Sequence, residues 1–335
     1  MLKYAIIGFG GLGKVHFRAY KEVKEKACTE VKLVALCDIR EQMFKEQTAT
    51  NLGNSDISLD FSDYNIYYDA DELLEKEELD FVVTALPTYL HEQMAVKVMK
   101  KGIHCFSEKP MAINLEQAEN MLKVSKEMGV KLMIGQCCRY NPRYQFLKEL
   151  VDTKKYGNLL RADFYRLSLT PGGWNNWFQD GSKSGGAALD LHVHDVDLIN
   201  YIFGQPKFVS SHATNFKTEH DSIVTYYDYD GMVVTATGEW GCPQKYQFSS
   251  GLFAKFEQAT LEMKSGVMTL VVEGGEREVL DMPKTDDKAT EVIDFIDCIV
   301  NDKVSAINPA ESTFISTKIA LAEKQSADSG KIVEF

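Results

Sequence analysis

A glycine-rich stretch near the start of the chain constrains its fold more than any other feature. The apolar run Tyr4–Ile7 ends at Gly8-Phe9-Gly10-Gly11-Leu12-Gly13, and an apolar helical pattern follows over residues 15–23. A G-x-G-x-x-G spacing between a strand and a helix permits a tight turn, close approach of the backbone to a pyrophosphate, and close helix packing. The helix N-terminus then offers N–H groups to the phosphates. The stretch predicts a dinucleotide site, although the bare spacing is equally consistent with a plain glycine-rich turn.

An acidic residue follows the second predicted strand. Residues 31–37 form an apolar run that ends in Asp38. A carboxylate at this position accepts hydrogen bonds from the adenosine ribose hydroxyls and repels a 2′-phosphate, which favours NAD over NADP. Arg40 leaves NADP open, because an arginine pairs well with a phosphate. Asp38 is also a candidate cap for a helix that begins at Glu41.

Strands and helices go on alternating as far as residue 136. Strands are predicted over residues 79–86, 103–107 and 131–136, and helices over residues 41–52, 69–74, 90–101 and 114–129. This alternation is typical of βαβ units in a parallel sheet, where ligands bind beyond the carboxyl ends of the strands. Two such ends carry Thr84-Ala85-Leu86-Pro87 and Glu108-Lys109-Pro110. We therefore expect a dinucleotide-binding Rossmann domain over residues 1–138.

Glu108-Lys109-Pro110 is the second informative stretch. A lysine between a buried strand and a proline is expected to point into the ligand crevice, where its ammonium would stabilise a developing alkoxide. Glu108 would then accept a hydrogen bond from a ribose hydroxyl. The alternative interpretation is a surface charge pair at the end of a strand, and the tripeptide alone favours that alternative.

A third stretch, residues 185–204, predicts one helix that ends at Gly204. Because successive residues of a helix turn by about 100°, Asp190, His194 and Asp197 fall on one stripe. A histidine between two carboxylates is suited to acid–base chemistry. The alternative is a helix whose polar residues only solvate a domain interface. His192 lies on another side of this helix, so His192 and His194 do not form a pair of metal ligands, and no metal site is predicted.

The second half of the chain predicts an α+β domain over residues 139–335. Arg139-Tyr140-Asn141-Pro142 marks the crossing into it, and residues 159–169 alternate as a strand. The loop 170–184 carries Trp174 and Trp177 beside asparagines, which suits a carbohydrate, although either tryptophan is equally suited to the core. Residues 207–280 show the turns of a large antiparallel sheet. Its second face needs a cover, either the tail helices or a second copy of the chain.

Together these residues resemble the Gfo/Idh/MocA family, the group of glucose–fructose oxidoreductase and inositol dehydrogenase. The resemblance spans nearly the whole chain and rests on an ordered set of motifs: Gly8 to Gly13, Leu86-Pro87 with His91, Glu108-Lys109-Pro110, and Gly185-Gly186 leading to Asp190 and His194. It implies that Lys109, Asp190 and His194 are catalytic. It also implies a homodimer or homotetramer formed through the open sheet face.

The function that follows is NAD(P)-dependent oxidation of a secondary alcohol on a sugar or cyclic polyol. His194 would act as general base and Asp190 would orient it or bind a hydroxyl, with Asp197 as possible support for the imidazole. The cofactor would contact the glycine turn, Asp38, Arg40 and the strand ends, that is Thr84, Leu86, Pro87, His91, Glu108 and Lys109. The substrate would contact Arg139, Trp174, Trp177, Asp190 and His194. Alternatives are an NAD-dependent glycoside-cleaving enzyme that works by transient oxidation and elimination, and a sensor that binds NAD without turnover.

Net charge and cysteine content limit the kinds of partner and the cellular compartment that we expect for this protein. The net charge of −12 argues against nucleic acid and anionic membranes, because both attract basic surfaces. The seven cysteines include no Cys-x-x-Cys pair and are an odd number, which indicates reduced thiols and a cytoplasmic protein. The N-terminal stretch has no signal-peptide pattern.

Overall fold

The described part of the chain, residues 1–45 and 60–335 in this computed structural model, forms two compact units. The first contains residues 1–112, 116–137 and 286–311, and the second contains residues 113–115, 138–285 and 312–335. The chain crosses between the units beside the predicted boundary at residue 138. The sequence-based division assigned the whole tail to the second domain. Residues 286–311 belong to the first unit instead, because their apolar side chains pack in its core.

The first unit is built on a six-stranded sheet in the order β3-β2-β1-β4-β5-β6. All five neighbouring pairs are parallel, and the order is that of a Rossmann fold. The predicted strands are therefore confirmed, and so is the parallel sheet. The strands are β1 (Leu2–Ile7), β2 (Val31–Cys37), β3 (Asn65–Tyr67), β4 (Phe81–Thr84), β5 (His104–Glu108) and β6 (Leu132–Gly135).

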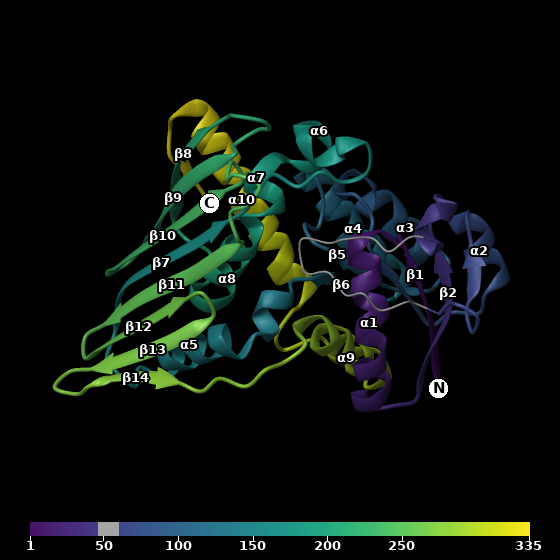
Figure 1. The fold of residues 1–335 in the computed structure, drawn as a ribbon, viewed down its shortest axis with the longest axis horizontal. Coiled ribbons are helices and arrows are strands. Elements are labelled where there is room, and N and C mark those ends of the chain that lie inside the picture. Colours follow the sequence, from purple (N-terminus) through teal and green to yellow (C-terminus); the bar gives the residue numbers. More distant parts are fainter. Residues whose placement is uncertain (46–59) are drawn as a thin grey trace. The chain divides into compact units, whose positions relative to one another are not determined.

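Helices cover this sheet, as the alternation predicted (Figure 1). They are α1 (Gly11–Lys26), α2 (Ala70–Lys76), α3 (His91–Lys100), α4 (Leu115–Met128) and α9 (Asp287–Val300), with short 3-10 helices η1 (Glu41–Phe44) and η2 (Thr88–Leu90). Asp69 caps α2 by accepting hydrogen bonds from the N–H groups of Asp71 and Glu72. The helix predicted over residues 41–52 begins as η1, and its remainder from residue 46 lies outside the described residues.

The second unit is built on a nine-stranded sheet in the order β14-β13-β12-β11-β7-β10-β9-β8-β15. Within this sheet, as far as the described residues show it, β7 and β10 pair in parallel and the other neighbours are antiparallel. This confirms the predicted large, mostly antiparallel sheet. The strands are β7 (Leu159–Leu167), β8 (Phe208–Thr214), β9 (Ser222–Tyr229), β10 (Met232–Glu239), β11 (Ser249–Phe256), β12 (Ala259–Lys264), β13 (Val267–Val272), β14 (Arg277–Leu280) and β15 (Val333–Glu334).

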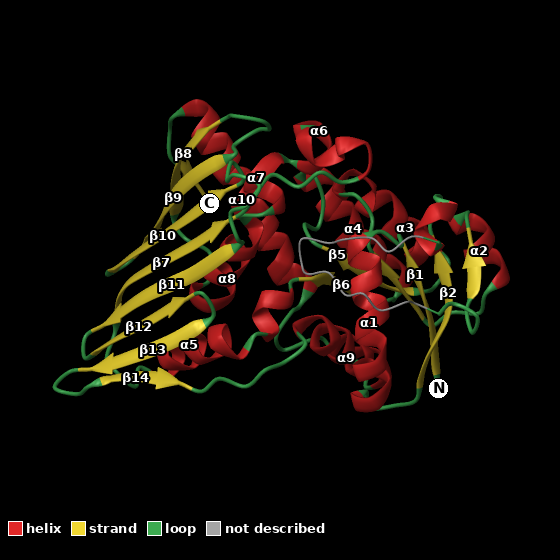
Figure 2. Cartoon of the chain, in the orientation of Figure 1, coloured by secondary structure: helices red, strands yellow, loops and turns green. Residues whose placement is uncertain are grey.

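Helices pack against one face of this sheet (Figure 2). They include α5 (Pro142–Thr153), α7 (Gly186–Asp190), α8 (Val193–Phe203) and α10 (Ala310–Ser329). Leu147, Leu198 and Ile319 from α5, α8 and α10 share one core with strand residues such as Phe164 and Leu252. The shorter η3 (Cys137–Tyr140), η4 (Trp174–Gln179) and α6 (Gly181–Ser184) complete the helices. None of the helices in the described ranges is long and apolar enough to cross a membrane.

The single helix predicted over residues 185–204 is wrong in one respect, because a turn at Leu191 and His192 divides it into α7 and α8. Both residues keep right-handed helical backbone angles. The hydrogen bonds change instead: the His192 N–H bonds to Ala187 O, five residues back, and the Asp195 N–H bonds to His192 O, three residues back. The winding is therefore wide before the turn and tight after it.

Candidate active site

The glycine turn forms a backbone cradle in which two glycines are packed too closely for a side chain. Gly8 has φ +92°, and a Cβ there would lie 2.4 Å from Ala85 O. A Cβ on Gly13 would lie 2.0 Å from Gly8 O, so a side chain is excluded at both positions. Helix α1 begins within this turn, at Gly11, and has no acidic residue in its first turn. This cradle fits a pyrophosphate at a helix N-terminus.

Asp38 occupies the position expected of a ribose ligand, and Arg40 lies against it. Its Oδ2 accepts a hydrogen bond from the Phe9 N–H at 2.8 Å, and Arg40 donates to both oxygens at 2.9 Å. The carboxylate is nearly buried. The Arg40 guanidinium thus balances the charge of the Asp38 carboxylate. That charge is what would repel the 2′-phosphate of NADP.

The loop after β4 is held in place by His91. Its Nδ1 lies 2.7 Å from Pro110 O and its Nε2 lies 2.8 Å from Leu86 O, so the ring joins the loops that follow β4 and β5. The ring is buried, and burial lowers its pKa. Thr84 is also fully buried. The side chains of these two predicted cofactor residues face the protein interior, and His91 holds the two loops together.

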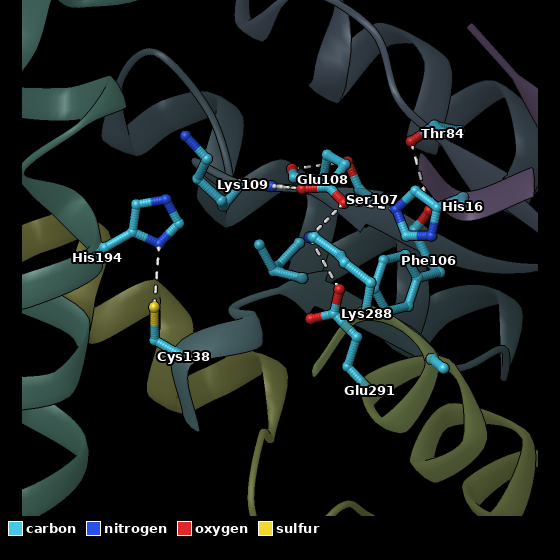
Figure 3. Close-up of polar contacts among 12 residues, drawn as sticks. His16, Thr84, Phe106, Ser107, Glu108, Lys109, Cys138, His194, Lys288 and Glu291 are labelled. Carbon is cyan, nitrogen blue, oxygen red and sulfur yellow. Dashed lines mark hydrogen bonds and ion pairs between the residues drawn. The ribbon is translucent and has the colours of Figure 1, made fainter. Parts of the chain in front are cut away.

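Glu108 lies in a buried charged cluster with residues of α1 and α9. Its Oε1 is 2.5 Å from His16 Nε2 and 2.7 Å from Lys288 Nζ, and Lys288 is also 2.9 Å from Glu291 (Figure 3). Burial alone would raise the pKa of Glu108, but the Lys288 ammonium and His16 hold it below its ordinary value. The prediction that Glu108 accepts a hydrogen bond from a ribose hydroxyl is therefore corrected, because this carboxylate is enclosed and bonded within the protein. Ligand atoms of His16, Glu108 and Glu291 lie as close together as in a metal site, and Lys288 supplies the positive charge among them.

Lys109 differs from its neighbour in burial and direction. It is half-buried, and Figure 3 shows its side chain extending away from the Glu108–Lys288 cluster. Its backbone N–H bonds to Glu108 Oε2 at 3.3 Å. The fixed carboxylate therefore fixes the backbone from which the lysine extends.

In the second unit, the stretch from Ser184 to Asn200 has only two residues that are not buried, Asp190 and His194. His194 Nδ1 lies 3.8 Å from Cys138 Sγ. The neighbouring Asp195 is bonded to Arg166 through both oxygens at 3.2 and 2.9 Å. The stretch thus buries Asp195 in an ion pair and leaves partly exposed the two residues that the resemblance implies to be catalytic.

Two predictions about this region are wrong. Arg139 was predicted to bind substrate, but it is fully buried and pairs with Asp197 at 2.6 and 2.8 Å. Asp197 also accepts a hydrogen bond from Ser316 at 2.7 Å, so it stabilises Arg139 and does not support the His194 ring. His192 is fully buried, which agrees with a packed histidine.

The aromatic residues of the loop and sheet separate into two groups. Trp174 is 40% exposed, whereas Trp177 is half-buried and stacks on Phe178 with ring centroids 3.8 Å apart. Trp240 is buried in the core below, against Phe178. Trp174 therefore has the exposed ring face that a sugar would need, and its contact with substrate stays a prediction.

Several residues of the site escaped the sequence interpretation. Lys288 lies 180 positions from Glu108 in the chain, and Arg166 pairs with Asp195 across 29 positions, so no local pattern connects them. His16 gave a weak signal, because it follows Gly13 by one helical turn on α1 and shares its buried face.

Comparison with known families agrees with this geometry. Residues 2–136 match a model described as an oxidoreductase family with an NAD-binding Rossmann fold, and residues 144–268 match the GFO/IDH/MocA C-terminal domain. The chain belongs to the Gfo/Idh/MocA family. NAD is thereby confirmed as the cofactor of the first unit, and the glycine cradle fits it.

Individual relatives of the family are distant. The chain is 29% identical over 238 residues to glucose-6-phosphate 3-dehydrogenase of Bacillus subtilis, covering 68% of this chain and 63% of that protein. It is 25% identical over 311 residues to 2,7-anhydro-N-acetylneuraminate hydratase of Mediterraneibacter gnavus, covering 86% of this chain and 75% of that protein. An Agrobacterium radiobacter oxidoreductase in complex with NAD+, L-tartaric acid and magnesium superposes with a TM-score of 0.83 at 16% identity, covering 99% of this chain and 98% of that chain. This last likeness shows the shared fold.

Proposed function

We propose that the chain is an NAD-dependent dehydrogenase that oxidises a secondary alcohol of a sugar or cyclic polyol. The observation that carries the proposal is the exposure of Asp190 and His194 on a stretch whose other residues are buried. The family membership and the glycine cradle support it. One relative, a glucose-6-phosphate 3-dehydrogenase, supports a sugar as the class of substrate.

In this mechanism His194 removes the proton of the reacting hydroxyl. We assign Nε2 as the atom that accepts this proton, because Nδ1 lies 3.8 Å from Cys138 Sγ. An imidazole has an unperturbed pKa near neutrality, which suits a general base. Asp190 accepts a hydrogen bond from a neighbouring hydroxyl and so orients the ring of the substrate.

Lys109 stabilises the negative charge that develops on the substrate oxygen. Its ammonium is suited to this role because a preorganised positive group stabilises an alkoxide more than the neutral alcohol. The glycine turn and the end of β2 would hold NAD, which would supply the hydride acceptor. The indole face of Trp174 covers the C–H face of the sugar ring.

The test is a panel of sugars, sugar phosphates and cyclic polyols, assayed by NADH absorbance with purified protein. On the best substrate, we expect His194→Asn to lower kcat by about a hundredfold or more, because general-base catalysis contributes that much. His212→Asn is the matched control, since His212 is an exposed histidine on β8 of the same unit. Equal kcat for His194→Asn and wild type would refute the assignment.

The glycoside-cleaving alternative keeps one specific support, the hydratase among the relatives. The same panel distinguishes it. Product formation without added cofactor and without net NADH would favour elimination, whereas NADH formed in proportion to substrate consumed favours the dehydrogenase.

A further inference from the structure

His192 lies in the turn that separates α7 from α8, two positions from Asp190 and two from His194. The flanking pair is half-exposed, whereas His192 is fully buried. The turn thus carries two outward-facing residues on either side of one buried polar residue. Its conformation decides where both outward side chains point.

Two other parts of the second unit face the buried imidazole. Nε2 of His192 is 3.4 Å from the Tyr227 hydroxyl on β9 and 3.5 Å from Glu323 Oε2 on α10. Tyr227 and Glu323 are also fully buried. The turn is therefore connected through one ring nitrogen to the sheet and to the tail helix.

The strand next to the ring is adapted to it. A Cβ on Gly238 of β10 would lie 3.0 Å from both Cβ and Nδ1 of His192. Real Cβ contacts are rarely so short, so a side chain at position 238 would displace the imidazole. Gly238 thus provides the space that the ring fills.

Burial disfavours the charged forms of these three side chains. Burial, assisted by the nearby Arg166, lowers the pKa of His192 to about 3. Burial raises the pKa of Glu323 well above its ordinary value. Burial thus favours the protonated form of Glu323, which is a hydrogen-bond donor, and the neutral form of His192, which has one acceptor nitrogen.

We propose that His192, held between Tyr227 and Glu323, is a positioning residue that fixes the α7–α8 turn and thereby the directions of Asp190 and His194. The inference rests on the proposed function for its catalytic consequence. An apolar residue would fill the same space without directional contacts, whereas the polar contacts of His192 with Tyr227 and Glu323 favour particular orientations of the ring. The inference assigns no ligand to the cluster, because all three residues are fully buried.

The first test compares variants that keep or remove the contact. His192→Leu and Glu323→Leu remove it, and we expect kcat to fall tenfold to about a hundredfold, since small displacements of catalytic groups have effects of that order. The KM for NAD should stay near its wild-type value. Glu323→Gln should restore most of the loss seen in Glu323→Leu, because its amide donates a hydrogen bond as the neutral carboxyl does.

A matched control separates positioning from stability. Asn200 also ties α8 to α10, donating from Nδ2 to Ser312 O and Ser316 Oγ at 2.9 Å, but it lies beyond the turn. Asn200→Leu should lower the melting temperature and leave the kcat of folded enzyme near wild type. If His192→Leu likewise lowers only the melting temperature, the positioning role is refuted.

A second measurement does not need turnover. Histidine side-chain NMR, assigned with the His194→Asn variant, reports the environment of the His194 ring. We expect His192→Leu to shift or broaden the His194 ring signals and Asn200→Leu to leave them unchanged. Inactivity of the wild type on every substrate would refute the proposed function alone, whereas unchanged His194 signals in His192→Leu would overturn the positioning inference.

Discussion

The Asp38 carboxylate is bonded on both oxygens by groups of its own chain, which bears on cofactor choice. An ionised aspartate beside the ribose would repel a 2′-phosphate, but Arg40 pairs with it through two hydrogen bonds. The Arg40 side chain is 20% exposed, so its charge acts in a partly screened position. We infer that discrimination between NAD and NADP is weak in the wild type.

Replacing Arg40 should sharpen that discrimination. In Arg40→Ser the Asp38 charge is no longer balanced, so kcat/KM with NADP should fall relative to NAD by about tenfold, which corresponds to ~1.4 kcal/mol. Asp38→Ser should shift the preference toward NADP, because Arg40 then meets the phosphate alone. The measurement is kcat/KM with each cofactor at saturating substrate. An equal loss with both cofactors in Arg40→Ser would contradict this account.

At the scale of elements, the sequence predicted most strands and helices because their apolar patterns are regular. Strands β1, β2, β4 and β6 are largely apolar on both faces, as is typical of a sheet covered by helices. The division between α7 and α8 was not predictable in the same way. Its residues keep helical angles and an apolar pattern, and only the hydrogen-bond register changes.

The partners of the site residues were the least predictable part. Asp190 and His194 were identified from spacing and resemblance. They stand out in the structure because nearby polar residues are buried in pairs such as Arg139–Asp197, which forms across 58 positions of the chain. Spacing on a helix shows which residues share a stripe, but it does not show which of them meets a buried arginine. That is why Asp197 was taken for support of His194.

The buried carboxyl of α10 should leave a signature in the pH dependence of stability. The pKa of Glu323 is raised by burial and by nearby Asp195, while Tyr227 opposes the shift. When the pH rises above the ordinary glutamate pKa of 4.5, the unfolded chain loses the Glu323 proton before the folded protein does. The folded state therefore loses stability as the pH rises. Glu323→Gln has no such proton. Its stability relative to wild type should increase with pH, by up to about 1.4 kcal/mol per pH unit.

Urea unfolding of both proteins at about pH 5 and pH 8 measures this difference. His192 and Arg166 also lie near this site, but they are present in both proteins, so their contributions largely cancel in the comparison. A stability difference that is the same at both pH values would show that Glu323 ionises in the folded state.

At the scale of the whole molecule, one face of the nine-stranded sheet is not covered by any described helix and exposes apolar side chains. The faces of β9 and β10 alternate, so that Ile223, Tyr227 and Val234 are buried while Val224 and Val233 are about half exposed. Helices cover only the buried face. Exposed apolar residues on a broad flat surface are typical of protein interfaces. We retain the proposal that a second copy of the chain covers this face.

Val233→Lys tests that proposal. A lysine on this face would have to lose its water on association, and in a symmetric pair it would be introduced twice, so the oligomer should dissociate. The control is Val304→Lys in the first unit, because Val304 is 68% exposed and lies outside the sheet. Light scattering coupled to gel filtration gives the mass of each protein. We expect a dimer or tetramer for wild type and Val304→Lys and a monomer for Val233→Lys; a monomeric wild type, or a Val233→Lys protein of unchanged mass, would exclude this face as the interface.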